Sequence, residues 1–264
     1  MVDKVLLITG ASSGIGEATA RYAAQKGYSL FVTARRVERL ERLCTEVNSQ
    51  GGKAVYDAAD LTDLSQINAV VGNALDQYGK IDVLVNNAGF GRLKWLEQLD
   101  PLEDIARQIQ LNLISVIQLT RAVLPRMIQN KGGHIINIDS VAGFIGIPTY
   151  SVYAASKFGL RGFNEALRRE VGVYGIKVSG VYPGSVDTEF AENAGIERKS
   201  SIKTPAWLQL NAHQVGRSII NLIQHPKNQV IIPGYMTYAV WINQVFPGFV
   251  DQIMRIGFVQ KEKQ

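Results

Sequence analysis

The stretch that decides the fold is residues 4–16, Lys-Val-Leu-Leu-Ile-Thr-Gly-Ala-Ser-Ser-Gly-Ile-Gly. Its first part, 4–9, contains the unbroken apolar run 5–8 and is of the kind that forms a buried strand. Residues 16–26 have helix-forming composition and amphipathic spacing. Glycines at positions 10, 14 and 16 allow the chain to turn tightly between the two elements. The stretch therefore predicts a strand–turn–helix unit at the start of an α/β sheet.

The same alternation of short apolar runs and amphipathic segments continues along most of the chain. Repeated units of this kind predict a doubly wound parallel sheet of about seven strands, a Rossmann fold, with helices on both faces. We find no linker, repeat or low-complexity tract, so residues 1–264 are expected to form a single domain. The predicted strands are 4–9, 29–33, 53–56, 81–85, 134–138, 177–181 and 229–232. The predicted helices are 16–26, 37–49, 64–78, 102–129 and 153–174.

Composition excludes several classes of protein. The net charge is +5, but no basic run or aromatic-interleaved basic stripe indicates a nucleic-acid site. Cys44 is the single cysteine, so an intrachain disulfide is excluded. His134, His213 and His225 lack the spacing of metal ligands, and we expect no metal site. Residues 1–4 do not resemble a secretory signal, and no run of about 20 apolar residues occurs, so we expect a cytoplasmic protein.

The glycine-rich turn predicts a phosphate site. It follows the first strand and opens a helix, whose free N–H groups and positive dipole end favour an anion. Its glycines allow the backbone to approach a pyrophosphate closely. The alternative, a merely tight turn between strand and helix, is disfavoured by this position in the sheet. The cofactor contacts expected from the turn are Gly10, Ser12, Ser13, Gly14, Ile15 and Gly16.

The end of the second predicted strand selects the cofactor. An NAD-binding chain usually has an acidic residue there for the ribose hydroxyls. This chain has Arg35 and Arg36 in the sequence Thr-Ala-Arg-Arg, and two guanidinium groups suit a 2′-phosphate. The alternative is a solvated helix start with no ligand. We therefore predict NADP(H) as the cofactor.

Three further segments carry polar side chains at the ends of later strands. Asn86-Asn87-Ala88-Gly89 ends the fourth strand, and Ser140 follows the fifth. Tyr153 and Lys157 lie four residues apart, on one face of a predicted helix. Together with Asp60-Leu61, Asn112 and 183–188 (Pro-Gly-Ser-Val-Asp-Thr), these motifs closely resemble the short-chain dehydrogenase/reductase family. The resemblance runs from about residue 3 to 190 and more loosely to Pro233.

The resemblance implies an oxidoreductase that moves a hydride between nicotinamide and a carbonyl or alcohol carbon. It implies that Tyr153 donates the proton, and that the cation of Lys157 favours the phenolate and bonds the nicotinamide ribose. Ser140 would bind the substrate oxygen, and Asn112 would hold a water that links Lys157 to solvent. Asp139 and Asp187 lie near the site in sequence but receive no role. Further cofactor contacts implied by the family pattern are Asp60, Leu61, Asn86, Ala88, Gly89, Tyr153, Lys157, Pro183, Gly184, Val186 and Thr188.

Two regions depart from the simplest family members. Residues 189–211 are polar, without clear periodicity, and are predicted to be a substrate-loop region. Residues 235–264 form a C-terminal extension rich in aromatic residues. The extension could be an ordinary packed tail, wall a lipophilic pocket, or touch a membrane surface without spanning it. Because it could block the tetramer interface that follows the last strand, we expect a homodimer, formed through the helices at 102–129 and 153–174, rather than a tetramer.

The leading hypothesis is an NADPH-dependent reductase of a lipophilic ketone or aldehyde, or the reverse alcohol oxidation. A 3-oxoacyl-thioester reductase is the main alternative within the same chemistry. A non-catalytic NADP-binding sensor is the alternative from another class, and the presence of Ser140, Tyr153 and Lys157 argues against it. The physiological substrate is not predicted, because loops of this kind determine it.

Overall fold

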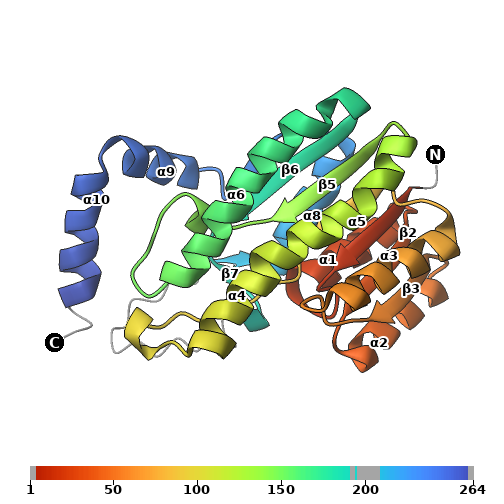
Figure 1. Cartoon of the computed structure of the whole chain (residues 1–264), viewed down its shortest axis with the longest axis horizontal. Coiled ribbons are helices and arrows are strands. Elements are labelled where there is room, and N and C mark those ends of the chain that lie inside the picture. The colour runs from red at the N-terminus through yellow and green to blue at the C-terminus, as the bar shows by residue number, and fades with distance from the viewer. Residues whose placement is uncertain (1–3, 191–193, 195–208, 261–264) are drawn as a thin grey trace.

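The computed structural model describes residues 4–190, 194 and 209–260. Most of the predicted substrate-loop region 189–211, and residues 261–264 of the extension, therefore lie outside the described residues. Seven parallel strands form one sheet in the order β3-β2-β1-β4-β5-β6-β9, which confirms the predicted Rossmann fold (Figure 1). The strands are β1 Val5–Thr9, β2 Ser29–Ala34, β3 Lys53–Ala58, β4 Val83–Asn86, β5 Gly133–Ile138, β6 Ile176–Pro183 and β9 Gln229–Ile232.

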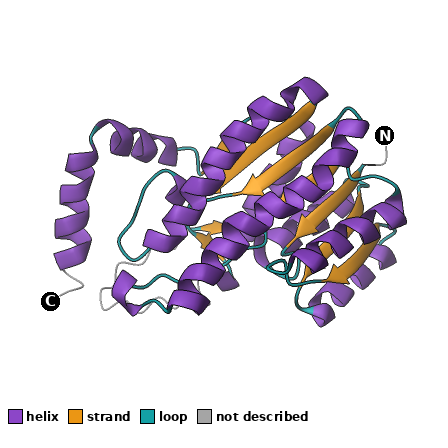
Figure 2. Cartoon of the chain, viewed as in Figure 1, coloured by secondary structure: helices purple, strands orange, loops and turns teal. Residues whose placement is uncertain are grey.

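Helices cover both faces of the sheet (Figure 2). Leu6 and Ile8 of β1 pack into a core with α1, α2 and α8, whereas Leu7, between them, packs on the other face with α3 and α5. This alternation explains why the strands are continuous apolar runs, since each strand is covered on both sides. The helices are α1 Gly14–Gln25, α2 Val37–Ser49, α3 Leu64–Tyr78, α5 Ser115–Gln129, α6 Ser151–Val171 and α8 Ala212–Gln224.

The segment predicted as one helix over 102–129 is helical but not uniform. It contains π-helical turns at Pro101–Ala106 and Gln110–Ile114, separated by the short helix α4, Arg107–Ile109, and followed by α5. By length and composition Pro101–Gln129 could cross a bilayer. Leu119, Val123 and Met127 are instead buried in the core beside the sheet, as in a soluble α/β layer.

The C-terminal extension forms two helices, α9 Met236–Val245 and α10 Pro247–Met254, which stand away from the sheet in Figure 1. Val240 of α9 is buried against Phe144 and Tyr182, and Asn243 donates a hydrogen bond to the Phe144 carbonyl oxygen. After α10, the π-helical turn Arg255–Val259 buries Phe258, whose ring lies 6.5 Å from that of Trp95, so the extension is packed at α9 and again near its end. Its other side is apolar and exposed, with Tyr235, Tyr238, Trp241, Ile242, Val245, Phe246, Phe249, Ile253 and Ile256.

Candidate active site

The glycine-rich turn has the geometry that a phosphate site requires. Gly10 and Gly14 have φ angles of +64° and +57°, which L side chains rarely adopt. A Cβ on Gly16 would lie 2.4 Å from the Gly10 carbonyl oxygen, so no larger residue fits. Asn87 fixes the turn from the end of β4, because its amide donates to the carbonyl oxygens of Thr9 and Gly10. Ser13, the N-cap of α1, makes no side-chain cap bond, which leaves N–H groups at the start of the helix for a ligand.

An arginine cluster borders this turn. Arg36 donates hydrogen bonds to Ser12 Oγ (3.1 Å) and Ser13 Oγ (2.6 Å), and so links the end of β2 to the turn. The Glu189 carboxylate bridges Arg36 (2.7 Å) and Arg39 (2.5 Å). Hydrogen bonds from both guanidinium groups lower the pKa of Glu189. Arg39 was not predicted from the sequence as a site residue. It lies one helical turn after Arg36, and this spacing is the signal that places both guanidinium groups on the same face.

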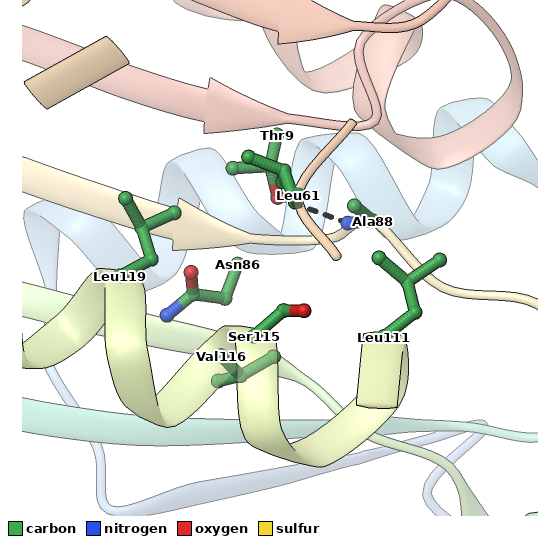
Figure 3. Close-up of a pocket in the computed structure, with 8 residues that line it drawn as sticks. All are labelled: Thr9, Leu61, Asn86, Ala88, Leu111, Ser115, Val116 and Leu119. Carbon is green, nitrogen blue, oxygen red and sulfur yellow. Dashed lines mark hydrogen bonds between the residues drawn. The ribbon is translucent and has the colours of Figure 1, made fainter. Parts of the chain in front are cut away.

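The predicted nucleoside contacts meet at the end of β4. Leu61 and Ala88 line one small pocket with Leu111 of the neighbouring helical segment, as Figure 3 shows. The Ala88 N–H donates to Thr9 Oγ1 over 2.9 Å, which ties this segment to the end of β1. Asn86 is buried, and its amide donates to Asn137 Oδ1 and Thr120 Oγ1. The Asn86 side chain therefore links β4 to β5 and to α5 inside the core.

Asp60 lies on the same side of the site, after β3. Its carboxylate accepts hydrogen bonds from the N–H and hydroxyl of Thr62. Burial alone would raise the pKa of Asp60, but these bonds and the charges of Arg35 and Arg107 outweigh it and lower that pKa. Asp60 is thus an ionised acceptor beside the nucleoside side of the site.

The predicted catalytic side chains come together where β5 ends against α6. Ser140 Oγ accepts a hydrogen bond from the Ala142 N–H (3.1 Å), and the Ser140 side chain is near enough to Tyr153 to act on the pKa of its phenol; both Tyr153 and Lys157 are buried. Lys157 Nζ donates to the Ile138 carbonyl oxygen (2.9 Å) and lies 5.7 Å from the centroid of the Tyr153 ring. Burial raises the pKa of Tyr153, and the hydrogen bond with Ser140 acts against that rise. In this state the phenol holds its proton and can donate it.

Asn112 lies beside this group on the π-helical turn Gln110–Ile114. Its amide donates to the Phe90 carbonyl oxygen (2.8 Å), and its Oδ1 accepts from the Phe90 N–H (3.0 Å). The amide also lies 3.3 Å from Ser156 Oγ, next to Lys157 in sequence. The contacts shown therefore make Asn112 a tie between the segment after β4 and α6. Its role in holding a water remains a prediction.

Asp139 is a polar residue of the site to which the sequence argument gave no role. It is 4% exposed, and its Oδ1 accepts a hydrogen bond from the Ser140 N–H (2.9 Å). Its Oδ2 has no hydrogen-bond partner in the described part of the chain. Burial raises the pKa of Asp139 to about 7, although the charge of Lys157 opposes the rise. In the sequence, its position directly after the fifth strand and before Ser140 was the available sign that it lies near the site.

The segment after β6 closes the site from the other side. The Gly184 N–H donates to the Ile232 carbonyl oxygen (2.7 Å), and Thr188 contacts the turn closely enough that a Cβ on Gly14 would lie 3.2 Å from its methyl group. Val186 lies in β7, Val186–Asp187, which pairs with β8, Leu210–Asn211. Of the predicted contacts in 183–188, Thr188 thus lies against the glycine-rich turn, whereas Gly184 lies beside the end of β9.

Apolar side chains line the substrate side of Tyr153. Leu93, Ala142, Tyr153 and Ala194 form a buried cluster, against which Tyr150 and Phe190 pack. The rings of Tyr153 and Phe190 are 5.6 Å apart. Tyr153 thus has Lys157 on one flank and apolar and aromatic side chains on another.

Comparison with known proteins agrees with this geometry. A model of the short chain dehydrogenase family matches residues 4–199. The oxidoreductase BOA17 of Botryotinia fuckeliana is 35% identical over 240 residues, 90% of this chain and 84% of that protein. The 3-oxoacyl-[acyl-carrier-protein] reductase of Synechocystis is 38% identical, over 75% of this chain and 80% of that protein.

Solved structures show the same likeness. A short-chain dehydrogenase from Sphingobium yanoikuyae in complex with NADPH superposes with a TM-score of 0.81 at 30% identity, covering 96% of this chain and 95% of that one. The residues that the family model matches, 4–199, include the glycine-rich turn, the end of β5 and α6. The chain therefore belongs to the short-chain dehydrogenase/reductase family of oxidoreductases.

Proposed function

We propose that the protein is an NADP(H)-dependent reductase of a lipophilic ketone or aldehyde, with Tyr153 as the proton donor. The observation that carries this proposal is the burial of Tyr153 and Lys157 together on α6, beside Ser140 at the end of β5, in a chain that also has the glycine-rich turn and its arginine cluster. Such a set of groups serves proton transfer beside a bound nicotinamide, and a plain core would not bury a lysine in this way.

The residues around the turn fit NADP(H). The uncapped start of α1 and the glycines would hold the pyrophosphate, and Arg36 with Arg39 would hold the 2′-phosphate. The bridge from Glu189 to both guanidinium groups supports this, because it shows that the pair can bind one anion. When bound, NADPH supplies the hydride for the carbonyl carbon.

The chain's own residues supply the proton and the orientation. Burial keeps the Tyr153 phenol protonated, so its hydroxyl can donate to the carbonyl oxygen as negative charge develops there. The Ser140 hydroxyl can donate to the same oxygen and so positions the carbonyl. Lys157, held by the Ile138 carbonyl oxygen, stabilises the phenolate left after the proton has moved.

The apolar lining supports a lipophilic substrate. Tyr150, Phe190 and Leu93 surround the approach to Tyr153, and they offer a carbonyl compound burial of hydrocarbon or ring surface. A 3-oxoacyl thioester is the second candidate, because its acyl chain suits the same lining and the Synechocystis relative is named for that reaction.

The test is the consumption of NADPH with aromatic aldehydes, steroid-like ketones, long-chain ketones and 3-oxoacyl thioesters. Wild type should turn over at least one class, and Tyr153→Phe should lose about 100- to 10,000-fold in kcat/KM. Tyr174→Phe, which removes a hydroxyl from an exposed tyrosine after α6, is the matched control. Equal turnover by wild type and Tyr153→Phe would contradict the proposal.

We also propose a cytoplasmic homodimer formed through α5 and α6. One exposed stripe of α6 consists of small and apolar residues and suits close helix packing. Its members are Ala155, Phe158, Gly162 and Ala166. Light scattering should give a dimer for wild type and a monomer for Gly162→Arg. A dimer of unchanged stability in Gly162→Arg would place the interface elsewhere, with the exposed side of α9 and α10 as the next surface to test.

A further inference from the structure

The carboxylate of Asp139 is enclosed at the centre of the candidate active site. It follows β5 directly, and one of its oxygens accepts the Ser140 N–H while the other has no hydrogen-bond partner among the described residues. Gly143 allows the chain to close over it, because a Cβ there would lie 2.9 Å from Asp139 Oδ1 and 3.1 Å from the Lys157 carbonyl oxygen. An acid buried in this way needs a compensating charge or a proton.

The charged and titratable groups that act on Asp139 come from two elements. Lys157, Arg161 and Tyr153 face it from α6, and Tyr182 faces it from β6. The ammonium of Lys157 is bonded to the carbonyl oxygen of Ile138, the residue before Asp139. The guanidinium of Arg161 lies over the ring of Phe144. Asp139 is thus the negative charge in a buried group whose other ions are cations.

The effects on ionisation agree with this arrangement. Burial lowers the pKa of Lys157, and the charge of Asp139 acts in the opposite direction. Burial raises the pKa of Tyr153, and the charge of Asp139 raises it further. Asp139 itself has a pKa of about 7, so it is ionised in the alkaline range in which a buried tyrosine loses its proton.

This arrangement bears on the direction of proton transfer. In carbonyl reduction a hydride goes to carbon, and the Tyr153 O–H bond breaks as its proton goes to the carbonyl oxygen. A cation beside Tyr153 favours the phenolate and so lowers the pH at which the phenol loses its proton, whereas a carboxylate near the same cation offsets that effect. We propose that Asp139 is a positioning residue, a buried counter-charge to Lys157 that keeps the proton on Tyr153 and thereby sets the upper pH limit of carbonyl reduction. The inference rests on the proposed function.

The first test compares pH profiles of wild type and Asp139→Asn, which keeps the side chain's shape and removes its charge. The alkaline fall of kcat/KM for NADPH-dependent reduction should move to lower pH by about one unit or more, which is a tenfold change in the ionisation constant. Asp76→Asn, an exposed carboxylate on α3, should leave the profile unchanged. A purely structural role for Asp139 would lower stability without moving the profile.

The second test needs no substrate. Tyrosinate absorbance is titrated in wild type, Tyr153→Phe, Asp139→Asn and the double variant. The difference between wild type and Tyr153→Phe gives the ionisation step of Tyr153 with the carboxylate present, and the difference between Asp139→Asn and the double variant gives that step without it. That step should lie at lower pH by about one unit or more without the carboxylate. A step at the same pH in a folded Asp139→Asn protein would overturn the inference. If Asp139→Asn does not fold, Asp139→Ser, the smaller neutral variant, is measured with the same criterion.

The two tests separate the inference from the proposed function. If the Tyr153 step moves but no carbonyl substrate is reduced, the counter-charge stands and the proposed reaction fails. If carbonyls are reduced with Tyr153 as donor but neither the step nor the profile moves, the reaction stands and the role of Asp139 fails.

Discussion

The arginine cluster at the end of β2 and the buried group at the end of β5 use charge in opposite ways. The side chains of Arg36 and Arg39 are 41% and 39% exposed, and they share the carboxylate of Glu189 at the surface. Tyr153, Lys157 and Asp139 are 7%, 6% and 4% exposed. Water screens the charges of Arg36 and Arg39, so several contacts are needed before this cluster binds one nucleotide in preference to another. In the second group one charge can shift an ionisation that decides activity.

Loss of the buried cation should have the largest effect and sharpen this contrast. Lys157→Met removes the charge that stabilises the phenolate and leaves Asp139 without its counter-ion. We expect kcat/KM for reduction to fall about 100- to 1,000-fold, as for loss of other charge-stabilising groups in active sites. Lys53→Met, which removes an exposed lysine of β3, is the control. A fall below tenfold in a folded Lys157→Met protein would remove the contrast between the two regions.

His134, at the start of β5, tests whether burial also controls the ionisation of a side chain that lies away from the site. His134 is buried, and burial lowers its pKa from 6.5 to about 4, with smaller contributions from the charges of Lys177 and Lys4. As the pH falls, the unfolded chain therefore takes up a proton at His134 before the folded protein does. The free energy of unfolding falls by about 3 kcal/mol in all between pH 6.5 and pH 4. His134→Asn should flatten the fall in unfolding free energy over this range, measured by urea denaturation. An unchanged slope would show that burial does not control this group.

Loss of one surface arginine should have a moderate effect on binding alone. Arg36→Ala removes the hydrogen bonds to Ser12 and Ser13 and, with them, the contact that we propose for the 2′-phosphate. We expect the Kd for NADPH to rise about tenfold, with a much smaller change for NADH. Quenching of protein fluorescence by each nucleotide measures both constants. Equal losses for NADPH and NADH would mean that Arg36 supports the turn and does not select the phosphate.

Loss of the bridging carboxylate should have the smallest effect. In Glu189→Gln no negative charge competes with a 2′-phosphate for Arg36 and Arg39. Because these ion pairs are half exposed, we expect NADPH to bind only about two- to fivefold more tightly. The same titration with NADH, which lacks the phosphate, is the control and should change little. Weaker binding of NADPH by Glu189→Gln would show that Glu189 orders the cluster.

Much of this molecule could be predicted from the sequence because local signals agree with one another. The strand runs and the glycine-rich turn each follow from a pattern of a few neighbouring positions, whereas Ser140, Tyr153 and Lys157 were predicted from the resemblance of the whole set of motifs to one family. The structure confirms the parallel sheet, including the prediction of about seven strands. It also brings the three predicted catalytic side chains to one place.

The missed features depend on contacts between distant segments. Arg39 becomes part of the site only through Glu189, which is 150 positions away. Asp139 gains its importance from burial against α6, and no local pattern gives the depth of a residue. The π-helical turns at 101–106 and 110–114 interrupt a segment whose spacing predicts one helix. Helix propensities change too little over a few residues to indicate such turns.

Transfer of deuterium from NADPH carrying the label at C4 of the nicotinamide tests the central claim most directly. With the best carbonyl substrate of the panel, wild type should give an alcohol with deuterium on the former carbonyl carbon, detected by mass spectrometry. Tyr153→Phe should still bind the nucleotide, and at saturating NADPH it should form this product at least about a hundredfold more slowly. Label that stays on the nicotinamide in a folded, NADPH-bound wild type with every substrate class would contradict the account.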